Sequence, residues 1–180
     1  MTPDATEGGT VSDRIEREKV SVLFVCTGNI CRSPTAEAVF RRLIEREQLA
    51  DRIVVDSAGT HGYHVGDPPD RRAQAAAKRR GYDMGRQRAR RLEPEDCRRH
   101  DYLIVMDSDN YRIVRSFCSD GGAAKLHRFL EFASQDSELD VPDPYYGGDA
   151  GFEHVLDLIE SAASGLLATI KDERLKEQPA

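Results

Sequence analysis

The stretch 20–34 (VSVLFVCTGNICRSP) constrains the fold more than any other part of the chain. Its first half, residues 20–25, is an apolar run rich in β-branched residues, which is typical of a parallel strand buried on both faces. A loop follows at residues 27–32, and Ser33 and Pro34 favour the cap and first position of a helix. The sequence therefore predicts a strand, a tight loop and a helix in direct succession.

The predicted loop has the chemistry of a phosphate-binding site. Gly28 and Asn29 tolerate left-handed backbone conformations, so successive N–H groups can face an anion, and the helix adds the positive end of its dipole. Cys26 and Arg32 add a thiolate nucleophile and a bidentate ligand for phosphoryl oxygens. The alternative is an ordinary buried cysteine at the end of a strand. The residues expected to surround the phosphate are Thr27, Gly28, Asn29, Ile30, Cys31 and Ser33.

A second stretch whose residues could take part in catalysis lies at 141–148 (VPDPYYGG). Pro142 and Pro144 hold the backbone extended around Asp143, which places a carboxyl group on a stiff loop. Such a group suits a general acid that protonates a leaving oxygen and afterwards, as a carboxylate, activates water. From the residues alone, Asp143 could equally be a turn aspartate.

Four apolar segments separated by helical patterns predict an α/β fold. We expect a single-domain, doubly wound sheet of four parallel strands flanked by helices on both faces, with ligands bound beyond the carboxyl ends of the strands. Cys26 lies at one of those ends. The expected strands are residues 20–25, 53–55, 102–106 and 125–130.

Length and composition bound the remaining possibilities. The chain has 180 residues, 39% of them hydrophobic, which suffices for one domain with its own core. We expect a flexible tail at 1–18 and a folded domain at 19–175. No apolar stretch approaches the roughly 20 residues of a membrane span, and the net charge of −6 argues against binding to nucleic acid or anionic membranes. The expected location is cytoplasmic.

The four cysteines are spaced too irregularly to predict a disulfide framework or a zinc site. A reducing compartment therefore fits, and no metal or cofactor is expected. His61 and His64 share one predicted loop but have no third ligand nearby, so we interpret them as surface residues. We also predict that mild oxidation joins Cys26 reversibly to Cys31.

The segment 78–99 is rich in arginine. It could guide acidic phosphopeptides or RNA toward the predicted site. Alternatively it is a solvated face whose cations pair with Glu93, Glu95 and Asp96. The sequence leaves both interpretations open.

Over residues 20–170 the chain resembles the low-molecular-weight protein tyrosine phosphatases. The resemblance implies hydrolysis of phosphotyrosine and aryl phosphates through a phosphocysteine on Cys26, with Arg32 binding phosphate and Asp143 as general acid and base. It implies no cofactor. The motifs that carry the resemblance are 26–34, 36–40 (AEAVF), 56–60 (DSAGT), 64–66 (HVG), 102–107 with Asn110, and 143–148 (DPYYGG).

The same resemblance assigns supporting roles. Ser57 is expected to brace the phosphate loop near Asn29, and Tyr63, Tyr145 and Tyr146 are expected to form the walls of the substrate cleft. Family members commonly carry tryptophan at the position of Tyr63, so this wall differs in shape here. Phosphotyrosine proteins are the expected partners, with a bacterial tyrosine kinase as one candidate.

Three other functions have to be weighed. Protein arginine phosphatases resemble the chain but typically carry threonine at the position of Ile30, so Ile30 and Tyr145 favour phosphotyrosine. Arsenate reductases of the same fold pass a disulfide outward through two further cysteines, and the spacing of Cys97 and Cys118 departs from that pattern. A phosphotyrosine-binding module with a dead active site would require the loss of Cys26, Arg32 or Asp143, and all three are present.

Overall fold

The computed structural model describes residues 19–119, 125–134 and 138–176. The tail predicted at 1–18 lies outside these residues. The sheet has four parallel strands in the order β2-β1-β3-β4, so the predicted doubly wound fold is confirmed. The strands are β1 (Val20–Cys26), β2 (Ile53–Gly59), β3 (Tyr102–Val105) and β4 (Leu126–Arg128).

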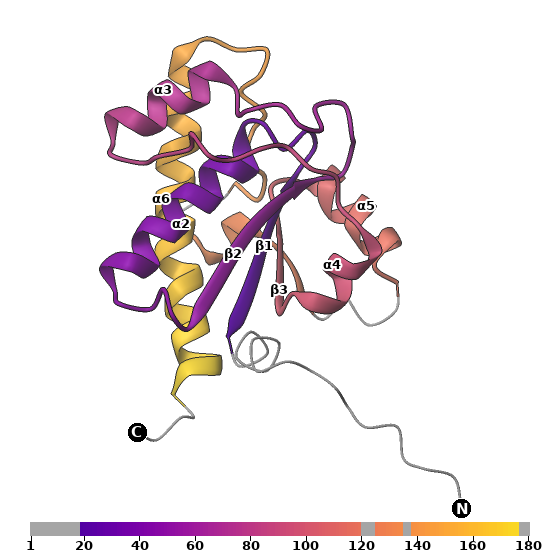
Figure 1. Ribbon diagram of the computed structural model, residues 1–180, viewed down its shortest axis with the longest axis vertical. Helices are drawn as coiled ribbons and strands as arrows, with labels where there is room; N and C mark the ends of the chain where they lie inside the picture. Colours follow the sequence, from indigo (N-terminus) through magenta and orange to yellow (C-terminus); the bar gives the residue numbers. More distant parts are fainter. Residues whose placement is uncertain (1–18, 120–124, 135–137, 177–180) are drawn as a thin grey trace, which may run out of the picture.

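Helices cover both faces of the sheet, as predicted, and Figure 1 shows the two layers on either side of it. One layer contains α2 (Arg32–Arg46), α3 (Arg71–Arg79) and α6 (Asp149–Ile170). The other contains the shorter helices α4 (Pro94–Arg99) and α5 (Ser108–Phe117). A 3-10 helix (Phe129–Phe132) follows β4, and a π-helical segment (Lys171–Leu175) extends α6.

The central position of β1 in the sheet explains why its sequence is continuously apolar. Phe24 contributes to the core beneath α2 and α6, where its ring centroid lies 5.7 Å from that of Phe40 and 5.1 Å from that of Phe129. Leu23 and Val25 contribute to a second core beneath α4 and α5. Because successive side chains of a strand point to opposite faces, a strand covered on both faces needs apolar residues at every position.

Two local predictions differ from the structure. Ser33 is not the cap of α2, which begins at Arg32 after Cys31 and has no side-chain cap bond. The reason is that the buried Ser33 hydroxyl faces the Cys26 sulfur, with 3.0 Å between Oγ and Sγ. The sequence analysis also missed α4, because four of its six residues are charged and it shows no apolar stripe.

The helix α3 ends as the sequence indicates. Asp70 caps it by accepting a hydrogen bond from the backbone N–H of Arg72. Gly81 follows with a φ of 85°, a left-handed conformation that favours glycine just past a helix.

The expectation that the cysteines form no disulfide was wrong. Cys97 on α4 and Cys118 at the end of α5 are joined, with their Cα atoms 5.5 Å apart, whereas Cys26 and Cys31 are free. Their 21-residue separation gave no signal, because the two positions meet only when α4 and α5 cover the same face of the sheet.

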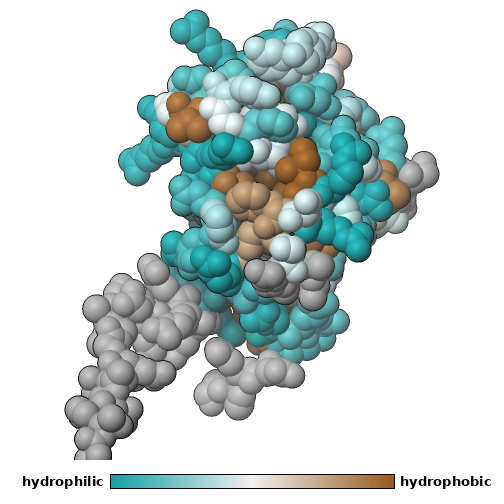
Figure 2. Space-filling view, turned by 90° about the vertical axis from the view of Figure 1, so that its right-hand side faces the viewer, coloured by the Kyte–Doolittle hydropathy of each residue, from teal (hydrophilic) through white to brown (hydrophobic). Residues whose placement is uncertain are grey.

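The face of the molecule formed by α4 and α5 has some exposed apolar side chains. The face on that side is mostly hydrophilic but has an apolar area near its middle (Figure 2). On α5, Phe117 is 42% exposed, whereas Val114 is fully buried. None of the helices in the described ranges is long and apolar enough to cross a membrane.

Removing the Cys97–Cys118 bridge should destabilise the protein. Closing a loop of 21 residues restricts the unfolded chain, which corresponds to about 3 kcal/mol in the free energy of unfolding. Urea denaturation of the double variant Cys97→Ala/Cys118→Ala should show this loss relative to the wild type. A thiol reductant should lower the stability of the wild type and leave that of the double variant unchanged; equal stabilities of the two proteins in its absence would contradict the prediction.

Candidate active site

The predicted site residues gather at the carboxyl end of β1, which lies between the ends of β2 and β3. There the loop 27–31 joins β1 to α2 and forms the floor of a cavity of about 260 Å³. Ten predicted residues line the cavity together with one that was interpreted as a surface residue, His64. The lining residues are Cys26, Thr27, Gly28, Ile30, Cys31, Arg32, Tyr63, His64, Asp143, Tyr145 and Tyr146.

The remaining three predicted residues support the loop from behind. Asn29, Ser33 and Ser57 are buried and joined by hydrogen bonds. Asn29 has a φ of 56°, the left-handed conformation expected at this position. The predicted site residues thus fall into two groups. Ten line the cavity, and three are buried behind the loop and support it.

The Asn29 amide has only one orientation that satisfies its surroundings. The backbone N–H of Arg90 can only donate, and it lies 2.9 Å from the Asn29 Oδ1. The Nδ2 therefore faces the two serines, and donates to Ser33 Oγ at 2.8 Å and to Ser57 Oγ at 3.0 Å. Because both serine oxygens accept from Asn29, each has its own proton left to donate.

The proton of Ser33 is available to the nucleophile. Its Oγ lies 3.0 Å from the Cys26 Sγ and 3.4 Å from the carbonyl oxygen of Ala58, so the sulfur is the nearer acceptor. A hydrogen bond from this hydroxyl stabilises the thiolate form of Cys26. Because the Ser33 hydroxyl faces the Cys26 sulfur, it does not cap α2.

The proton of Ser57 goes to a buried carboxyl group that the sequence analysis did not assign. Ser57 Oγ donates to Glu37 Oε2 at 2.6 Å, and Arg41 binds the other carboxyl oxygen. Burial raises the pKa of Glu37, while the hydrogen bond from Ser57 and the charge of Arg41 oppose that rise. Glu37 on α2 thus anchors Ser57, and through it Asn29.

The Arg32 side chain is almost completely buried, with 2% of it exposed, and hydrogen bonds hold it in place. Its NH1 donates to Asp107 Oδ2 at 2.6 Å and to the carbonyl oxygen of Val141 at 3.0 Å. Burial alone would lower the pKa of Arg32, but the negative charges of Cys26 and Asp107 raise it above its ordinary value. The guanidinium group therefore stays cationic beside the sulfur.

A third contact fixes the far side of the guanidinium group. Arg32 NH2 lies 3.4 Å from Thr27 Oγ1, which also accepts a hydrogen bond of 3.1 Å from Asn110 Nδ2. Asn110 is fully buried and its backbone N–H bonds to Asp107. The start of α5 therefore supports both the arginine and the loop.

Asp143 lies beside this group rather than remote from it. Its Oδ2 is 3.5 Å from Arg32 NH2, and its side chain is 45% exposed. The other oxygen, Oδ1, accepts a hydrogen bond from the backbone N–H of Tyr145. A half-exposed carboxyl group at the edge of the cavity can exchange protons with solvent and still reach a ligand on Cys26.

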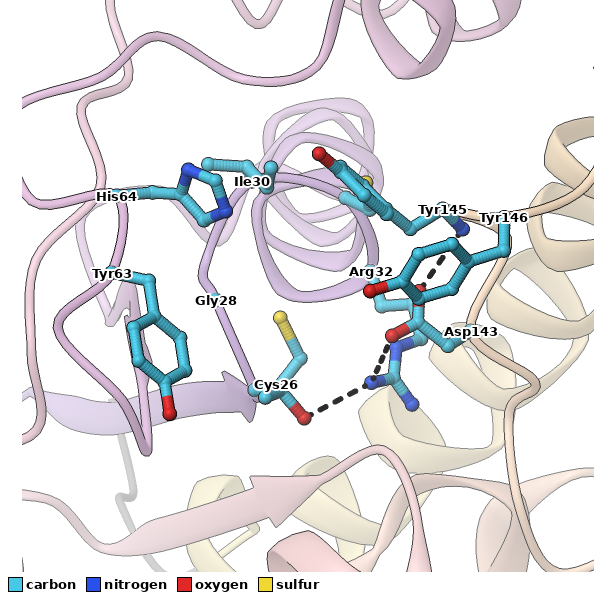
Figure 3. Close-up of a pocket in the computed structure, with 11 residues that line it drawn as sticks. Cys26, Gly28, Ile30, Arg32, Tyr63, His64, Asp143, Tyr145 and Tyr146 are labelled. Carbon is cyan, nitrogen blue, oxygen red and sulfur yellow. Dashed lines mark hydrogen bonds and ion pairs between the residues drawn. The ribbon is translucent and has the colours of Figure 1, made fainter.

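Two aromatic walls enclose the sulfur. Figure 3 shows Tyr63 and His64 on one side of Cys26, and Tyr145 and Tyr146 with Asp143 on the other. Tyr146 is 92% exposed and Tyr63 76% exposed, so each offers a free ring face at the mouth of the cavity. An aromatic ligand that enters between them can contact a ring on either side.

Cys31 differs from Cys26 in its surroundings. It is buried, and this burial together with the negative charges of Asp70 and Cys26 raises the pKa of its thiol far above the usual range. Cys31 therefore holds its proton more firmly than an ordinary thiol, and it does not compete with Cys26 for the phosphoryl group.

Sequence reasoning missed several functional neighbours. Asp107 and Asn110 stood in a motif of the family resemblance but were given no role in the site, although they follow β3 at the same edge of the sheet as Cys26. Their place after a neighbouring parallel strand was a usable signal. Gly59, at the end of β2, carried the same signal, whereas Glu37 inside α2 carried none. Within the described ranges, no group of three or more His, Cys, Asp or Glu side chains is arranged to hold a metal ion.

Gly59 is predicted to control the shape of the anion loop. A Cβ atom at this position would lie 2.8 Å from the carbonyl oxygen of Thr27 and 3.2 Å from Asn29 Cβ, so Gly59→Ala must displace the loop. We expect the increase in melting temperature that inorganic phosphate gives the wild type to be largely lost in Gly59→Ala. Gly62→Ala is the control, because its Cβ would meet nothing closer than 3.5 Å. Similar phosphate responses in both variants would contradict this role.

Comparisons with known proteins agree with this geometry. The sequence model of the family described as "Low molecular weight phosphotyrosine protein phosphatase" matches residues 21–177. The Bacillus subtilis protein YfkJ, a low molecular weight protein-tyrosine-phosphatase, is 41% identical over 155 residues, which cover 86% of this chain and 98% of YfkJ. The human low molecular weight phosphotyrosine protein phosphatase is 43% identical over 141 residues, covering 78% of this chain and 89% of the human protein.

Solved structures show the same likeness. A protein tyrosine phosphatase from Entamoeba histolytica, crystallised with Hepes in the active site, superimposes with a TM-score of 0.83 at 38% identity and covers 86% of this chain and 98% of its own. The crystal structure of YfkJ gives a TM-score of 0.82, with coverage of 87% and 97%. The expected family is thereby confirmed: this chain belongs to the low-molecular-weight protein tyrosine phosphatases.

Proposed function

We propose that this chain hydrolyses phosphotyrosine in proteins, and aryl phosphates in general, through a phosphocysteine intermediate on Cys26. Membership of the family supports this activity. The single observation that carries the mechanism is the convergence of Cys26, Arg32 and Asp143 on one cavity between tyrosine walls. The proposed catalytic domain comprises residues 19–175.

In the first step the phosphoryl group of the substrate sits in the loop 27–31 with its oxygens facing Arg32. The Cys26 thiolate attacks phosphorus while the bond to the tyrosine oxygen breaks. Asp143, in its protonated form, gives its proton to the departing phenolate oxygen. The phosphoryl group is then bound to sulfur, and the protein product leaves as a neutral phenol.

In the second step water replaces the sulfur. Asp143, now a carboxylate, removes a proton from a water molecule that attacks the phosphocysteine. The S–P bond breaks, and Ser33 donates its hydrogen bond to the sulfur as negative charge returns to it. Arg32 can follow the phosphoryl oxygens through both steps, since Asp107 and Val141 hold it from behind.

The placement of the disulfide supports phosphatase activity over arsenate reduction. A relay would have to pass oxidation from Cys26 to two further cysteines. Cys118 belongs to the core beneath α4 and α5, whereas Cys26 belongs to the core on the other face of the sheet. With the sheet between them, Cys97 and Cys118 cannot exchange with Cys26 in this fold. Arsenate turnover with thioredoxin would reverse this ranking.

The surroundings of Ile30 favour phosphotyrosine over phosphoarginine. Ile30 presents no hydroxyl group to the cavity that it lines with Tyr63 and Tyr145. An arginine phosphatase is expected to use a hydroxyl there to orient water. The apolar side chain and the two rings instead suit the flat ring of a tyrosyl ester.

Asp143→Asn should lower kcat for phosphotyrosine peptides by about 100- to 10,000-fold, the usual contribution of a general acid. The decrease should be smaller for p-nitrophenyl phosphate, because its leaving group needs no proton. Asp140→Asn is the matched control, since Asp140 is exposed and, of the residues that the structure describes, bonds to Ser108 alone. Equal losses on both substrates, or a similar loss in Asp140→Asn, would count against the acid role.

Cys26→Ser separates catalysis from binding in the same assay. The proposal requires that this variant lose turnover and still bind a phosphotyrosine peptide. A wild type with activity no higher than that of Cys26→Ser would identify the chain as a phosphotyrosine-binding module instead.

We also propose that Cys31 protects the nucleophile from irreversible oxidation. Peroxide converts the Cys26 thiolate to a sulfenic acid with release of water, and the Cys31 thiol then displaces a second water to form a disulfide. Activity lost to mild peroxide should return with a thiol reductant in the wild type but not in Cys31→Ser. Mass spectrometry should find the 26–31 disulfide; two free thiols in the inactivated wild type would refute the proposal.

Two broader predictions remain to be tested. A bacterial tyrosine kinase is the proposed physiological substrate, which a pull-down with the trapping variant Cys26→Ser would identify. We propose a cytoplasmic location, in which Cys26 and Cys31 stay free thiols as they are in the structure, and in which the Cys97–Cys118 bridge would have to persist under reducing conditions. Cell fractionation checks that location.

A further inference from the structure

The arginine-rich segment 78–99 separates into two groups once the ion pairs are known. Four of its cations are bound to carboxylates within the fold: Arg79 and Arg80 to α6, Arg90 to Asp56 and Asp96, and Arg98 to Glu95. These four side chains form ion pairs within the fold. The others have no carboxylate partner among the residues that the structure describes, and two of them, Arg88 and Arg91, lie next to the active site.

The backbone around Arg88 and Arg91 runs against the loop that forms one wall of the cavity. Gly66 N–H donates to the carbonyl oxygen of Ala89 at 2.8 Å, and Ala89 N–H donates to that of Asp67 at 2.9 Å. Further along, Gly59 is bridged to Arg91. The segment 88–91 is therefore fixed directly behind the wall that carries Tyr63 and His64.

Both arginines are exposed and uncommitted. Within the described parts of the chain, Arg88 bonds to the backbone carbonyl oxygens of Gly85 and Gln87 alone. Arg91 extends past Gly62, where a Cβ atom would lie 3.5 Å from Arg91 Cδ, so it reaches the residue next to Tyr63. We call Arg88 and Arg91 the basic ridge.

Several carboxylates near the ridge already contact other side chains. Asp67 lies 3.3 Å from the His64 ring, and Asp56 and Asp96 both bind Arg90. The opposite wall carries the half-exposed carboxylate of Asp143, which lies 3.5 Å from Arg32 NH2. The ridge thus places two exposed cations on one side of the cavity mouth, opposite Asp143, although the whole chain has a net charge of −6.

From this asymmetry we infer that the enzyme selects phosphotyrosine peptides with acidic residues on one side of the phosphotyrosine, which the basic ridge binds. This inference rests on the proposed phosphatase function. An extended peptide advances about 3.3 Å per residue, so carboxylates two and three positions from the phosphotyrosine lie about 7 to 10 Å from it. That spacing carries them past Tyr63 toward Arg91 and Arg88. The same residues on the other side would approach Asp143.

The test compares kcat/KM for three phosphotyrosine peptides: one with two glutamates before the phosphotyrosine, one with two after it, and one with glutamines at all these positions. One acidic peptide should exceed the glutamine peptide by about three- to tenfold at low salt, and the advantage should shrink at high ionic strength. In Arg88→Gln/Arg91→Gln the ratio should fall to about one, while hydrolysis of p-nitrophenyl phosphate stays unchanged.

Arg115→Gln is the control, because Arg115 is an exposed cation on α5 with no ion pair among the described residues. Its peptide preference should match that of the wild type. The inference is overturned if neither acidic peptide is preferred, if the preference survives in the ridge variant, or if Arg115→Gln weakens it equally. Stronger inhibition by single-stranded RNA than by an unphosphorylated acidic peptide, abolished in the ridge variant, would likewise overturn it. A wild type unable to hydrolyse p-nitrophenyl phosphate would instead reject the underlying function.

Discussion

The fixed orientation of one buried amide, that of Asn29, is the constraint on which the active site depends. Its oxygen must face the backbone N–H of Arg90, so its nitrogen must face Ser33 and Ser57. The left-handed backbone at Asn29 turns the loop, and the Ser33 proton is thereby directed to Cys26. An unpaired polar group at this depth would be costly, so the network favours a single conformation of the loop.

Both helical layers of the fold contribute to this arrangement. From one layer, α2 supplies Arg32 and the carboxyl group of Glu37 that holds Ser57. From the other, the start of α5 supplies Asp107, which binds the guanidinium group at 2.6 Å. The reactive sulfur therefore lies where elements from both faces of the sheet meet. The Cys97–Cys118 bridge joins α4 to α5 and so braces the layer that positions Asp107.

The cations around the cavity are of two kinds: one is buried and acts in catalysis, and two are exposed and, as we propose, act in substrate recognition. Arg32 is almost completely buried beside the sulfur, where low dielectric strengthens its interaction with a phosphoryl group. Arg88 and Arg91 are exposed, so each can contribute only weakly and in a salt-dependent manner. Arg32 thus binds the phosphoryl group whatever the sequence around the phosphotyrosine. The basic ridge can discriminate between substrates without altering the chemistry.

The sequence by itself determined the strand, loop and helix around Cys26 and the parallel sheet, because they follow from local residue types and their spacing. The tyrosines that line the cavity were expected from the family resemblance, and His64 was not expected there. Only the tertiary structure decided which distant groups meet. The Cys97–Cys118 bridge, the Asp107–Arg32 ion pair and the Ser57–Glu37 bond each join positions at least 20 residues apart. Likewise, only folding showed which arginines of 78–99 are paired, since an arginine looks the same in sequence whether or not a carboxylate from another helix reaches it.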